Sequence, residues 1–462
     1  MAWLQSTVRA EHDVFSTSAQ VVATASLAIR APAGGYWFRY RFDQSLSSVT
    51  HSFRTADEGL DFSVRFSVFP QREPGSYTDT LSVSICYDEA CSREVQGSPF
   101  TMPLRLDVGY FARAEQGVTP VVPVQTTVLD HDVVGVAYSA ALDAVITASA
   151  LPEPMLRVHD LRSGLVRSHA LLTAPTSLSV GADGLHAAVG HDAAVSLVDL
   201  QAGPASAVSR MQVPMAVGSV VLAGARIVAI GAQAFNWNDI YWVDTATGVA
   251  TRAGSGKVFG IGDSVLHPSG DRIYFADRGV SPDDVIRMDL DGDPAAAQTH
   301  DSRYHGDYAF CSRVAISPDG RRLYTGCGVV LSTATLLEDD MRYAGQMALS
   351  PADAATLQPY VSTALSVAPD GAHVALLEEN RYTCNPQIDR LDDCHTRVAV
   401  YDAATLARRS LLGLAPYQRG SDSLKQWGRR VMHRSDGSLI VMAEVRTRNE
   451  ATPTWLLHRL NP

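Results

Sequence analysis

The chain has 462 residues, of which 46% are hydrophobic and 19% charged, and its 38 Lys and Arg against 49 Asp and Glu give a net charge of −11. This composition is typical of a folded globular chain and excludes intrinsic disorder. The acidic balance argues against a dedicated nucleic-acid-binding protein, which normally presents a basic face. No run of ~18 apolar residues is present, so the sequence predicts no transmembrane segment.

Residues 1–110 have the pattern of short strands without an intervening helix. Apolar and polar residues alternate at 36–42, 62–68 and 81–85, and turn-forming Pro and Gly residues separate these stretches. Period-two alternation interrupted by turns is typical of an antiparallel β-sandwich. We therefore predict a sandwich domain over 1–110, followed by a Pro- and Gly-punctuated linker at 111–119.

From about residue 120 the chain repeats a β-rich unit of about 40–50 residues. In each unit a tight turn, such as SPDG at 317–320, joins two short apolar strands, and a third strand ends in a second turn, such as VDTATG at 243–248. The units begin near residues 131, 176, 217, 262, 311, 361 and 429. All-β repeats of this length predict propeller blades, so residues 120–462 are expected to form a seven-bladed β-propeller.

The last unit supplies three strands and then ends, while the strand-like stretch 120–129 precedes the first blade. An open ring would leave unpaired strand edges. We therefore expect residues 120–129 to close the ring as the outermost strand of the seventh blade, hydrogen-bonded to residues 454–460. The members of this strand that we expect are Val121, Val122, Val124 and Val128.

Two parts of the chain resemble known families. The recurring S-P-D-G and V-x-D-x-x-T-G pieces of residues 120–462 resemble the seven-bladed propellers of the YVTN/lactonase-like superfamily. The stretch GSYTDTLSVSICYDEAC at 75–91, with LRLDV at 104–108, resembles bacterial immunoglobulin-like modules of cell-surface proteins. The resemblance implies an all-β chain with an immunoglobulin-like sandwich before a propeller. It leaves the function open, because this propeller fold carries lactonases, electron-transfer subunits and binding scaffolds.

The six cysteines fall into three pairs that are close in sequence: Cys86 with Cys91, Cys311 with Cys327, and Cys384 with Cys394. Local pairing and an even count favour disulfides, which persist in oxidising compartments. The alternative is six reduced thiols in a cytosolic protein. With disulfides, the protein is expected to be periplasmic, cell-surface or secreted, with a signal peptide that is absent from this chain.

Charged residues of both signs precede or begin the innermost strands of several predicted blades, where they should face the central channel. They are Asp132, Asp263, Arg313, Arg429 and Arg430. Converging charges in a concave site can orient an anionic or polar ligand. The alternative is a water-filled channel in which these charges pair with one another.

Aromatic residues cluster beside Asn, Asp and His in three predicted loops. Those expected at the surface, together with their polar neighbours, are Trp237, Tyr304, His305, Asp307, Tyr308 and Trp427. Exposed aromatic faces of this kind contact sugar rings and peptide side chains. Within this set, His305 and Asp307 are also candidates for an acid–base pair.

No cofactor is predicted, and the sequence leaves calcium as a weaker alternative at Asp289, Asp291 and Asp293. Closely spaced carboxylates suit a hard cation, but an EF-hand loop requires Gly at its sixth position and Glu at its twelfth. Those positions hold Pro294 and His300 here. The same place in the other repeats is an ordinary strand-ending turn.

The chain contains no G-x-S-x-G, H-E-x-x-H, P-loop or strand-borne G-x-G-x-x-G motif. We therefore expect an exported, non-enzymatic binding or cell-surface protein whose propeller loop face binds a polysaccharide or a protein. The alternative is a lactonase-type propeller hydrolase, in which the channel Arg and Asp residues act on a cyclic ester or sugar lactone. A third possibility, an electron-transfer subunit, requires a redox partner that the sequence does not indicate.

Overall fold

The computed structural model describes residues 2–14, 20–28, 36–44, 47–54, 59–67, 73–115, 117–203, 207–260, 262–351, 360–380, 395–447 and 450–461. Across these residues the chain is nearly all strand, as predicted. The only helices among them are two single 3₁₀ turns, η1 (Pro294–Ala296) and η2 (Leu337–Asp339). Neither could cross a membrane, and the described residues hold no other helix.

The N-terminal region forms two four-stranded sheets that share one hydrophobic core. One sheet has the order β1-β3-β6-β5 and the other β2-β8-β7-β4. The strands are β1 (Ala2–Trp3), β2 (Val8–Asp13), β3 (Gln20–Ala28), β4 (Trp37–Phe42), β5 (Ser47–Arg54), β6 (Gly59–Ser67), β7 (Gly75–Cys86) and β8 (Phe100–Gly109). The predicted alternation places Phe62 and Val64 of one sheet in a common core with Leu81 and Val83 of the other. This arrangement is a β-sandwich.

The rest of the described chain builds six four-stranded sheets and one five-stranded sheet, which we number as blades in chain order, and one two-stranded hairpin. Blades 1 and 2 contain β11 (Gly135–Ser139), β12 (Ala144–Ser149), β13 (Met155–Asp160), β14 (Val166–Ala170), β15 (Pro175–Val180), β16 (His186–His191), β17 (Ala194–Asp199) and β18 (Val208–Gln212). Blades 3 and 4 contain β19 (Val217–Ala223), β20 (Arg226–Gly231), β21 (Trp237–Asp244), β22 (Ala250–Phe259), β23 (Ser264–Leu266), β24 (Arg272–Ala276), β25 (Val285–Asp289) and β26 (Thr299–Asp301).

Blades 5, 6 and 7 follow the same plan. They contain β27 (Val314–Ile316), β28 (Arg322–Thr325), β29 (Val329–Ser332), β30 (Arg342–Gln346), β31 (Tyr360–Val367), β32 (His373–Asn380), β33 (Arg397–Asp402), β34 (Arg408–Leu414), β37 (Trp427–His433), β38 (Leu439–Val445) and β39 (Thr454–Leu460). The innermost strands contact one another in the order β11, β15, β19, β23, β27, β31, β37 and back to β11. The sheets therefore close into a ring around a channel, which is a β-propeller.

The ring is closed by a strand from the start of the propeller region. β10 (Gln125–Leu129) pairs antiparallel with β39, with Val128 opposite Leu456, and becomes the outermost strand of blade 7. The backbone N–H of Val124 also donates to the carbonyl of Arg459 (2.8 Å).

Val121 lies elsewhere than expected. It belongs to β9 (Thr119–Val121), which adds in parallel to β34 at the edge of blade 6, and Val122 lies between β9 and β10. Pro123 follows directly and has no N–H to donate, so it interrupts the ladder and the chain passes from one blade to the next. The expected single strand 120–129 is thus two strands on neighbouring blades.

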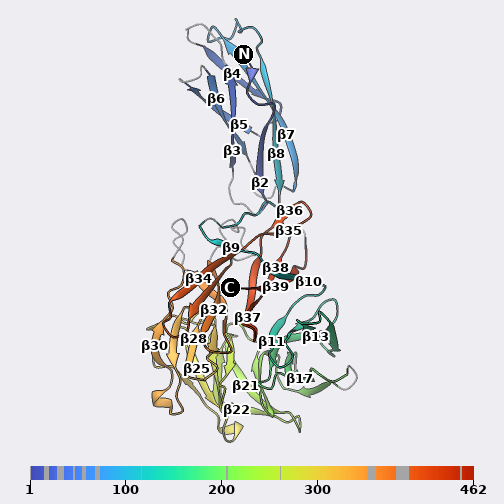
Figure 1. Ribbon diagram of the computed structural model, residues 1–462, viewed down its shortest axis with the longest axis vertical. Helices are drawn as coiled ribbons and strands as arrows, with labels where there is room; N and C mark the ends of the chain where they lie inside the picture. The colour runs from blue at the N-terminus through green and yellow to red at the C-terminus, as the bar shows by residue number, and fades with distance from the viewer. Residues whose placement is uncertain are drawn as a thin grey trace.

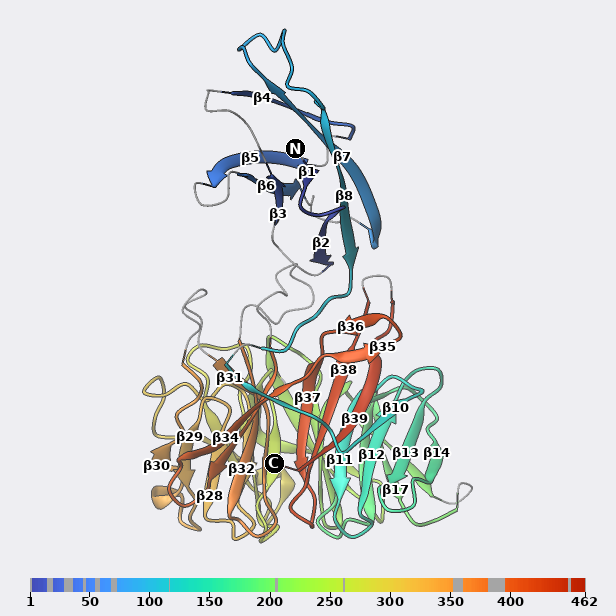
Figure 2. The same cartoon turned by 45° about the horizontal axis from the view of Figure 1, so that its top comes forward.

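The propeller has two distinct faces. All innermost strands begin at the face over which the sandwich stands, which we call the sandwich face (Figure 1, Figure 2). They end at the opposite face in tight hairpin turns, and we call this the hairpin face. The hairpin turns include residues 181–184, 268–270, 318–320, 369–371 and 435–437.

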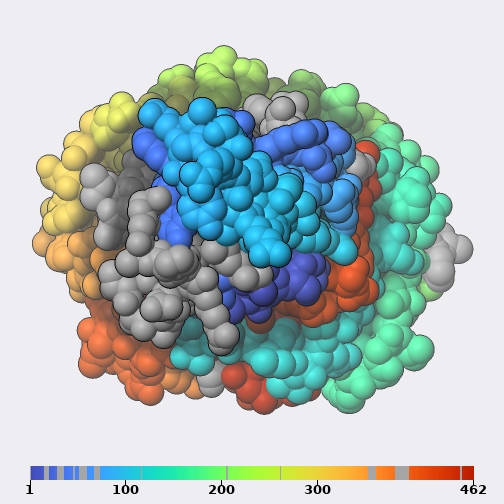
Figure 3. Space-filling model, turned by 90° about the horizontal axis from the view of Figure 1, so that it is seen from above, coloured from blue at the N-terminus to red at the C-terminus, as the bar shows by residue number. Residues whose placement is uncertain are grey.

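The sandwich is attached beside blade 7. A short hairpin, β35 (Tyr417–Arg419) and β36 (Asp422–Leu424), precedes β37 and forms a bridge to Phe111. The Ser423 hydroxyl donates to the Ala112 carbonyl (2.7 Å), and Leu424 shares a buried cluster with the sandwich core. Seen from above, the sandwich stands in front of the middle of the propeller (Figure 3).

Two of the three predicted cysteine pairs lie at disulfide distance. The Cα atoms of Cys86 and Cys91 are 5.1 Å apart, at the end of β7, and those of Cys311 and Cys327 are 5.3 Å apart, beside β27 and β28. Cys384 and Cys394 lie outside the described residues. The structure therefore confirms the pairing of the first four cysteines.

Candidate functional site

Three charged side chains meet at the sandwich face of the channel, on elements of three blades, and a fourth, that of Arg278, lies near enough to interact with their charges. Asp263 precedes β23, Arg313 precedes β27 and Arg430 lies in β37. An oxygen of the Asp263 carboxylate lies 2.9 Å from Nη1 of Arg313 and 3.7 Å from Nη1 of Arg430. Burial lowers the pKa of Arg278, the charges of Arg313 and Arg430 lower it further, and that of Asp263 raises it. We call these four residues the Asp263 cluster.

The backbone before β27 is built to hold Arg313 in this position. Cys311 and Ser312 both adopt left-handed conformations, with φ of 59° and 57°. Such conformations cost about 1–3 kcal/mol each and persist only where the surroundings impose them. Here Cys311 is paired with Cys327, and its N–H donates to the Asp283 carboxylate (2.7 Å).

A glycine leaves room for the Arg313 side chain. A Cβ atom at position 326 would lie 3.0 Å from the Cβ and 3.1 Å from the Cγ of Arg313. The Cβ and Cγ atoms of Arg313 therefore occupy space that the side chain of any larger residue at position 326 would need.

A second charged group adjoins the first. Arg429 and Arg446 both donate to the Glu444 carboxylate, at 2.5 and 2.6 Å. Glu379, which is only 4% exposed, accepts a hydrogen bond from the Thr396 hydroxyl (2.8 Å). Burial raises the pKa of Glu379 to about 7, while the charges of Arg429 and Arg313 act in the opposite direction. Glu379 therefore lies between the two groups.

The charges of the Asp263 cluster do not cancel. Its four residues, three arginines and one aspartate, carry a formal charge of 3 − 1 = +2, although the whole chain carries −11. Arginine presents planar forks of N–H donors that match carboxylate and sulfate groups. The arrangement can therefore hold an anionic group from a ligand at the mouth of the channel.

The structure brings together three of the five predicted channel residues, Asp263, Arg313 and Arg430, with Arg429 nearby. Asp132 is not among them: its carboxylate accepts hydrogen bonds from the Val133 N–H (2.9 Å) and from the indole N–H of Trp455 (2.9 Å). These two hydrogen bonds hold Asp132 at the junction of blades 1 and 7.

Sequence reasoning missed Arg278. It lies in the connection between β24 and β25, which runs from residue 277 to 284 and is longer than the matching connections of blades 2 and 5. The extra length of this connection relative to the other repeats is the sequence signal that could have identified Arg278.

The aromatic expectations are met only in part. Trp237 is 48% exposed, and its ring lies 5.4 Å from that of Phe259. Tyr304 and Tyr308 pack edge to face at 5.2 Å, and Tyr308 stacks on Tyr343 at 4.9 Å, so these rings contact one another. The expectation for Trp427 is wrong. It is fully buried, because the innermost strand β37 carries it into the interior.

The expected pairing of His305 with Asp307 is also wrong. Nδ1 of His305 lies 3.3 Å from the Asp284 carboxylate, and Asp307 is exposed. Asp284 is buried and also accepts from the Ser302 hydroxyl (2.5 Å), and burial raises its pKa. A carboxylate brought close by the fold, rather than the neighbour in sequence, is the partner of this histidine.

The possible calcium ligands serve other purposes. Asp289 pairs with Arg287 at 2.7 Å, Asp293 accepts from the Ala295 N–H at 3.0 Å, and Asp291 is exposed. Among the described residues, only Cys86, Cys91 and Glu94 bring three potential ligand atoms together, and the two sulfurs are within disulfide distance of each other. The calcium hypothesis gains no support from this geometry.

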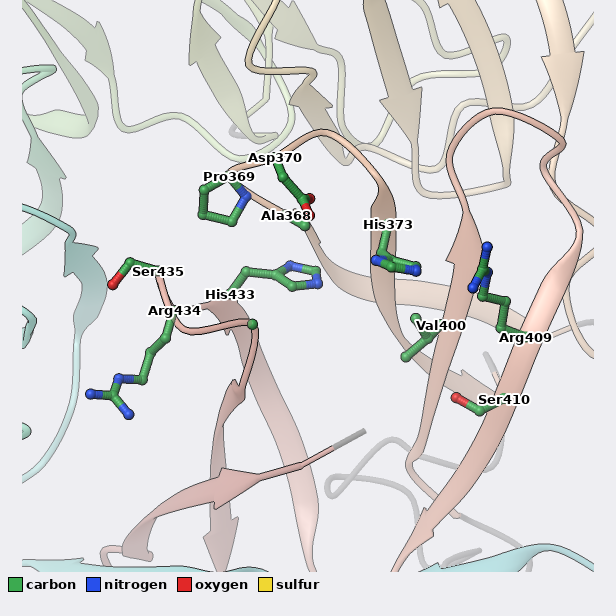
Figure 4. A pocket seen from close by; sticks show the side chains of 11 residues that line it. Ala368, Pro369, Asp370, His373, Val400, Arg409, Ser410, His433, Arg434 and Ser435 are labelled. Carbon is green, nitrogen blue, oxygen red and sulfur yellow. The ribbon is translucent and has the colours of Figure 1, made fainter.

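The hairpin face has a cavity of its own, of about 440 Å³, between blades 6 and 7 (Figure 4). His373 and His433 point into it. Burial lowers the pKa of His433 to about 4, so this imidazole is neutral at pH 7. The arginines that line the cavity are already paired, Arg434 with Asp143 at 2.6 Å and Arg409 with Asp402. The cavity therefore has no spare charge of the kind found in the Asp263 cluster.

No protein-family model matches the chain, and no curated protein sequence matches it. Among solved structures, the β-propeller domain of Myceliophteria thermophila Cps50 (Swd1) is similar to it, with 12% identity and a TM-score of 0.47 over 73% of this chain and 100% of that one. Kuenenia stuttgartiensis hydrazine synthase is similar with 14% identity and a TM-score of 0.44, over 71% of this chain and 99% of that one. These likenesses concern the propeller fold alone.

Proposed function

We propose that the chain is an exported, non-enzymatic binding protein whose sandwich face binds a polysaccharide or protein partner through an anionic group. The observation that supports this most is the Asp263 cluster, in which Arg313 and Arg430 share one carboxylate and Arg278 adds a third positive charge nearby. Convergent arginine N–H donors suit a carboxylate or sulfate group of a ligand. The two cysteine pairs are compatible with an oxidising compartment outside the cytoplasm.

In this proposal the N-terminal sandwich is an immunoglobulin-like module that serves as a spacer or docking unit. The propeller is of the YVTN type and presents the binding face. The short hairpin β35–β36 joins the two parts next to blade 7, which keeps the sandwich over the same face as the Asp263 cluster.

The binding test is a glycan array, followed by titration calorimetry on the full chain and on an Arg313→Ala variant. We expect binding of at least one acidic ligand by the wild type, and weaker binding by the variant. Retention of every ligand by Arg313→Ala would contradict the proposal. Non-reducing mass spectrometry of protein from the native host tests export separately, because free thiols at the four paired cysteines would exclude it.

A lactonase-type hydrolase is the second candidate, and one observation favours it. Glu379 has a pKa raised to about 7 and is influenced by Arg313 and Arg429, so it could exchange a proton near neutral pH. A panel of lactones with the same Arg313→Ala variant separates the candidates. Turnover that this substitution abolishes would favour the enzyme, and absence of turnover on all lactones would favour the binding protein.

A further inference from the structure

We propose that the partner of the sandwich face is an acidic polysaccharide, whose carboxylate or sulfate binds the Asp263 cluster while its sugar ring lies on Phe235. This inference rests on the proposed binding function and names the class of ligand. It is carried by the position of an exposed aromatic ring against the backbone segment that carries Arg278.

Phe235 lies in the connection between β20 and β21 and is 81% exposed. Its ring covers the backbone of Gly279, where a Cβ atom would lie only 3.1 Å from the ring carbon Cδ1. Gly279 has φ of +86° and directly follows Arg278. The flat apolar face of Phe235 therefore packs on the residue that directly follows Arg278 of the Asp263 cluster.

The Phe235 loop is held in place by a buried amide. Asn238 is 1% exposed, and its Nδ2 donates to the carbonyls of Gln233 (2.8 Å) and Gly260 (3.0 Å). Its Oδ1 accepts from the Gln233 N–H (2.9 Å). A ring that is exposed but whose loop is fixed loses little conformational entropy when a ligand binds, which favours affinity.

The size of this surface favours a glycan over a protein. Stable protein–protein interfaces bury about 800 Å² on each partner and contain several apolar anchors. Here the exposed rings of Phe235 and, two residues along the chain, Trp237 accompany the segment that carries Arg278. One aromatic face and one anionic site match a single acidic sugar unit, whose ring is partly apolar and whose acid group is at its edge.

The test uses the full chain in titration calorimetry with three probes. They are a galacturonate hexamer, its methyl ester, which keeps the rings and removes the charge, and a sulfated dextran oligosaccharide. We expect binding of at least one acidic probe, weakened about tenfold or more by Arg278→Gln, which removes a charge-assisted contact, and by Phe235→Ala. The acidic probe that binds tells whether the acid is a carboxylate or a sulfate.

The matched control is Arg321→Gln. The Arg321 side chain is 85% exposed and lies on the hairpin face, so this variant should bind within about twofold of wild type if only the sandwich face is used. Affinity of the wild type should also fall as salt rises, and that of Arg278→Gln should fall less. Thermal melting of each variant establishes that it is folded.

The outcomes separate the inference from the proposed function. Equal affinity for the hexamer and its methyl ester, with no effect of Arg278→Gln, would overturn the acidic-polysaccharide assignment and leave a binding protein for neutral glycans. Binding of an acidic protein with no binding of any glycan would also overturn it. If no probe and no array ligand binds, the result would contradict both the acidic-polysaccharide assignment and the proposed binding function.

Discussion

The two faces of the propeller use arginine in different ways. On the hairpin face, three buried arginines pair with three separate carboxylates: Arg272 with Asp271 at 2.8 Å, Arg287 with Asp340 at 2.7 Å and Arg434 with Asp143 at 2.6 Å. On the sandwich face, Arg313 and Arg430 share Asp263, with Arg278 nearby, and Arg429 and Arg446 share Glu444. These arginines of the hairpin face thus have individual carboxylate partners, whereas the arginines of the sandwich face outnumber the carboxylates that they share.

The difference between the two faces follows from the sequence repeat of the blades. The hairpin face is built from tight turns that recur in the blades, and two of its ion pairs, Arg287 with Asp340 and Arg434 with Asp143, connect one blade to the next. The sandwich face is built from the connections that vary in length between blades, such as residues 277–284. Positions that repeat therefore stabilise the ring, while positions that depart from the repeat are free to recognise a ligand.

Removal of the closing strand β10 should have the largest effect on the stability of the fold, because both faces depend on one closed ring. A shortened chain that begins at residue 112 keeps β9 and β10, and one that begins at residue 131 lacks both. We expect the longer of the two to melt cooperatively and the shorter to unfold or aggregate, since β39 would become an unpaired edge. Equal melting temperatures would show that β10 does not close the ring.

Arg434→Gln tests the hairpin face. Arg434 is 7% exposed, and its guanidinium contacts Asp143 across the junction of blades 7 and 1. Loss of one partner of a buried ion pair leaves the other uncompensated and costs about 3–5 kcal/mol. Urea unfolding of this variant should therefore show a loss of a few kcal/mol. A loss no greater than that of Arg321→Gln, expected to be below about 1 kcal/mol, would mean that the pair contributes nothing.

Glu379→Gln should have an effect that depends on pH. The folded-state pKa of Glu379 is raised from 4.5 to about 7, so its stabilising contribution is complete below 4.5 and is lost as the pH rises through 7. The difference in unfolding free energy between wild type and variant should shift in favour of the variant, by up to ~3 kcal/mol, between pH ~5 and pH ~8. A difference that stays constant over this range would contradict the raised pKa.

Arg313→Gln should have the smallest effect on stability. The side chains of Arg313 and Asp263 are each 22% exposed, and Arg430 remains close to Asp263 after the substitution. We expect a loss of less than about 1 kcal/mol in urea unfolding, together with weaker ligand binding. A loss as large as that of Arg434→Gln would mean that the Asp263 cluster stabilises the fold in the same way as the hairpin face does.

The repeat made the fold predictable from sequence. Turns such as SPDG at 317–320, flanked by apolar strands, specify a blade locally, and the closure by residues 125–129 followed from counting strands. Val121 could not be assigned in this way, because a period-two pattern does not tell which sheet edge a strand joins. Two cysteine pairs were predictable because their members are close in sequence and flank a turn or hairpin.

The site was less predictable, because its contacts come from different blades. Asp263, Arg313 and Arg430 could be named from their place before or within innermost strands, but Arg278 lies in a connection whose path sequence does not specify. His305 pairs with Asp284 rather than with its neighbour Asp307 for the same reason. Trp427 was misplaced because a residue at the start of an innermost strand can face either the interior or the channel.

A crystal structure of the full chain with the acidic oligosaccharide that binds most tightly in calorimetry would test the central claim most directly. The account predicts the acid group in contact with Arg278, Arg313 and Arg430, and a sugar ring against Phe235. Ligand in the hairpin-face cavity between His373 and His433, with the Asp263 cluster unchanged, would contradict it.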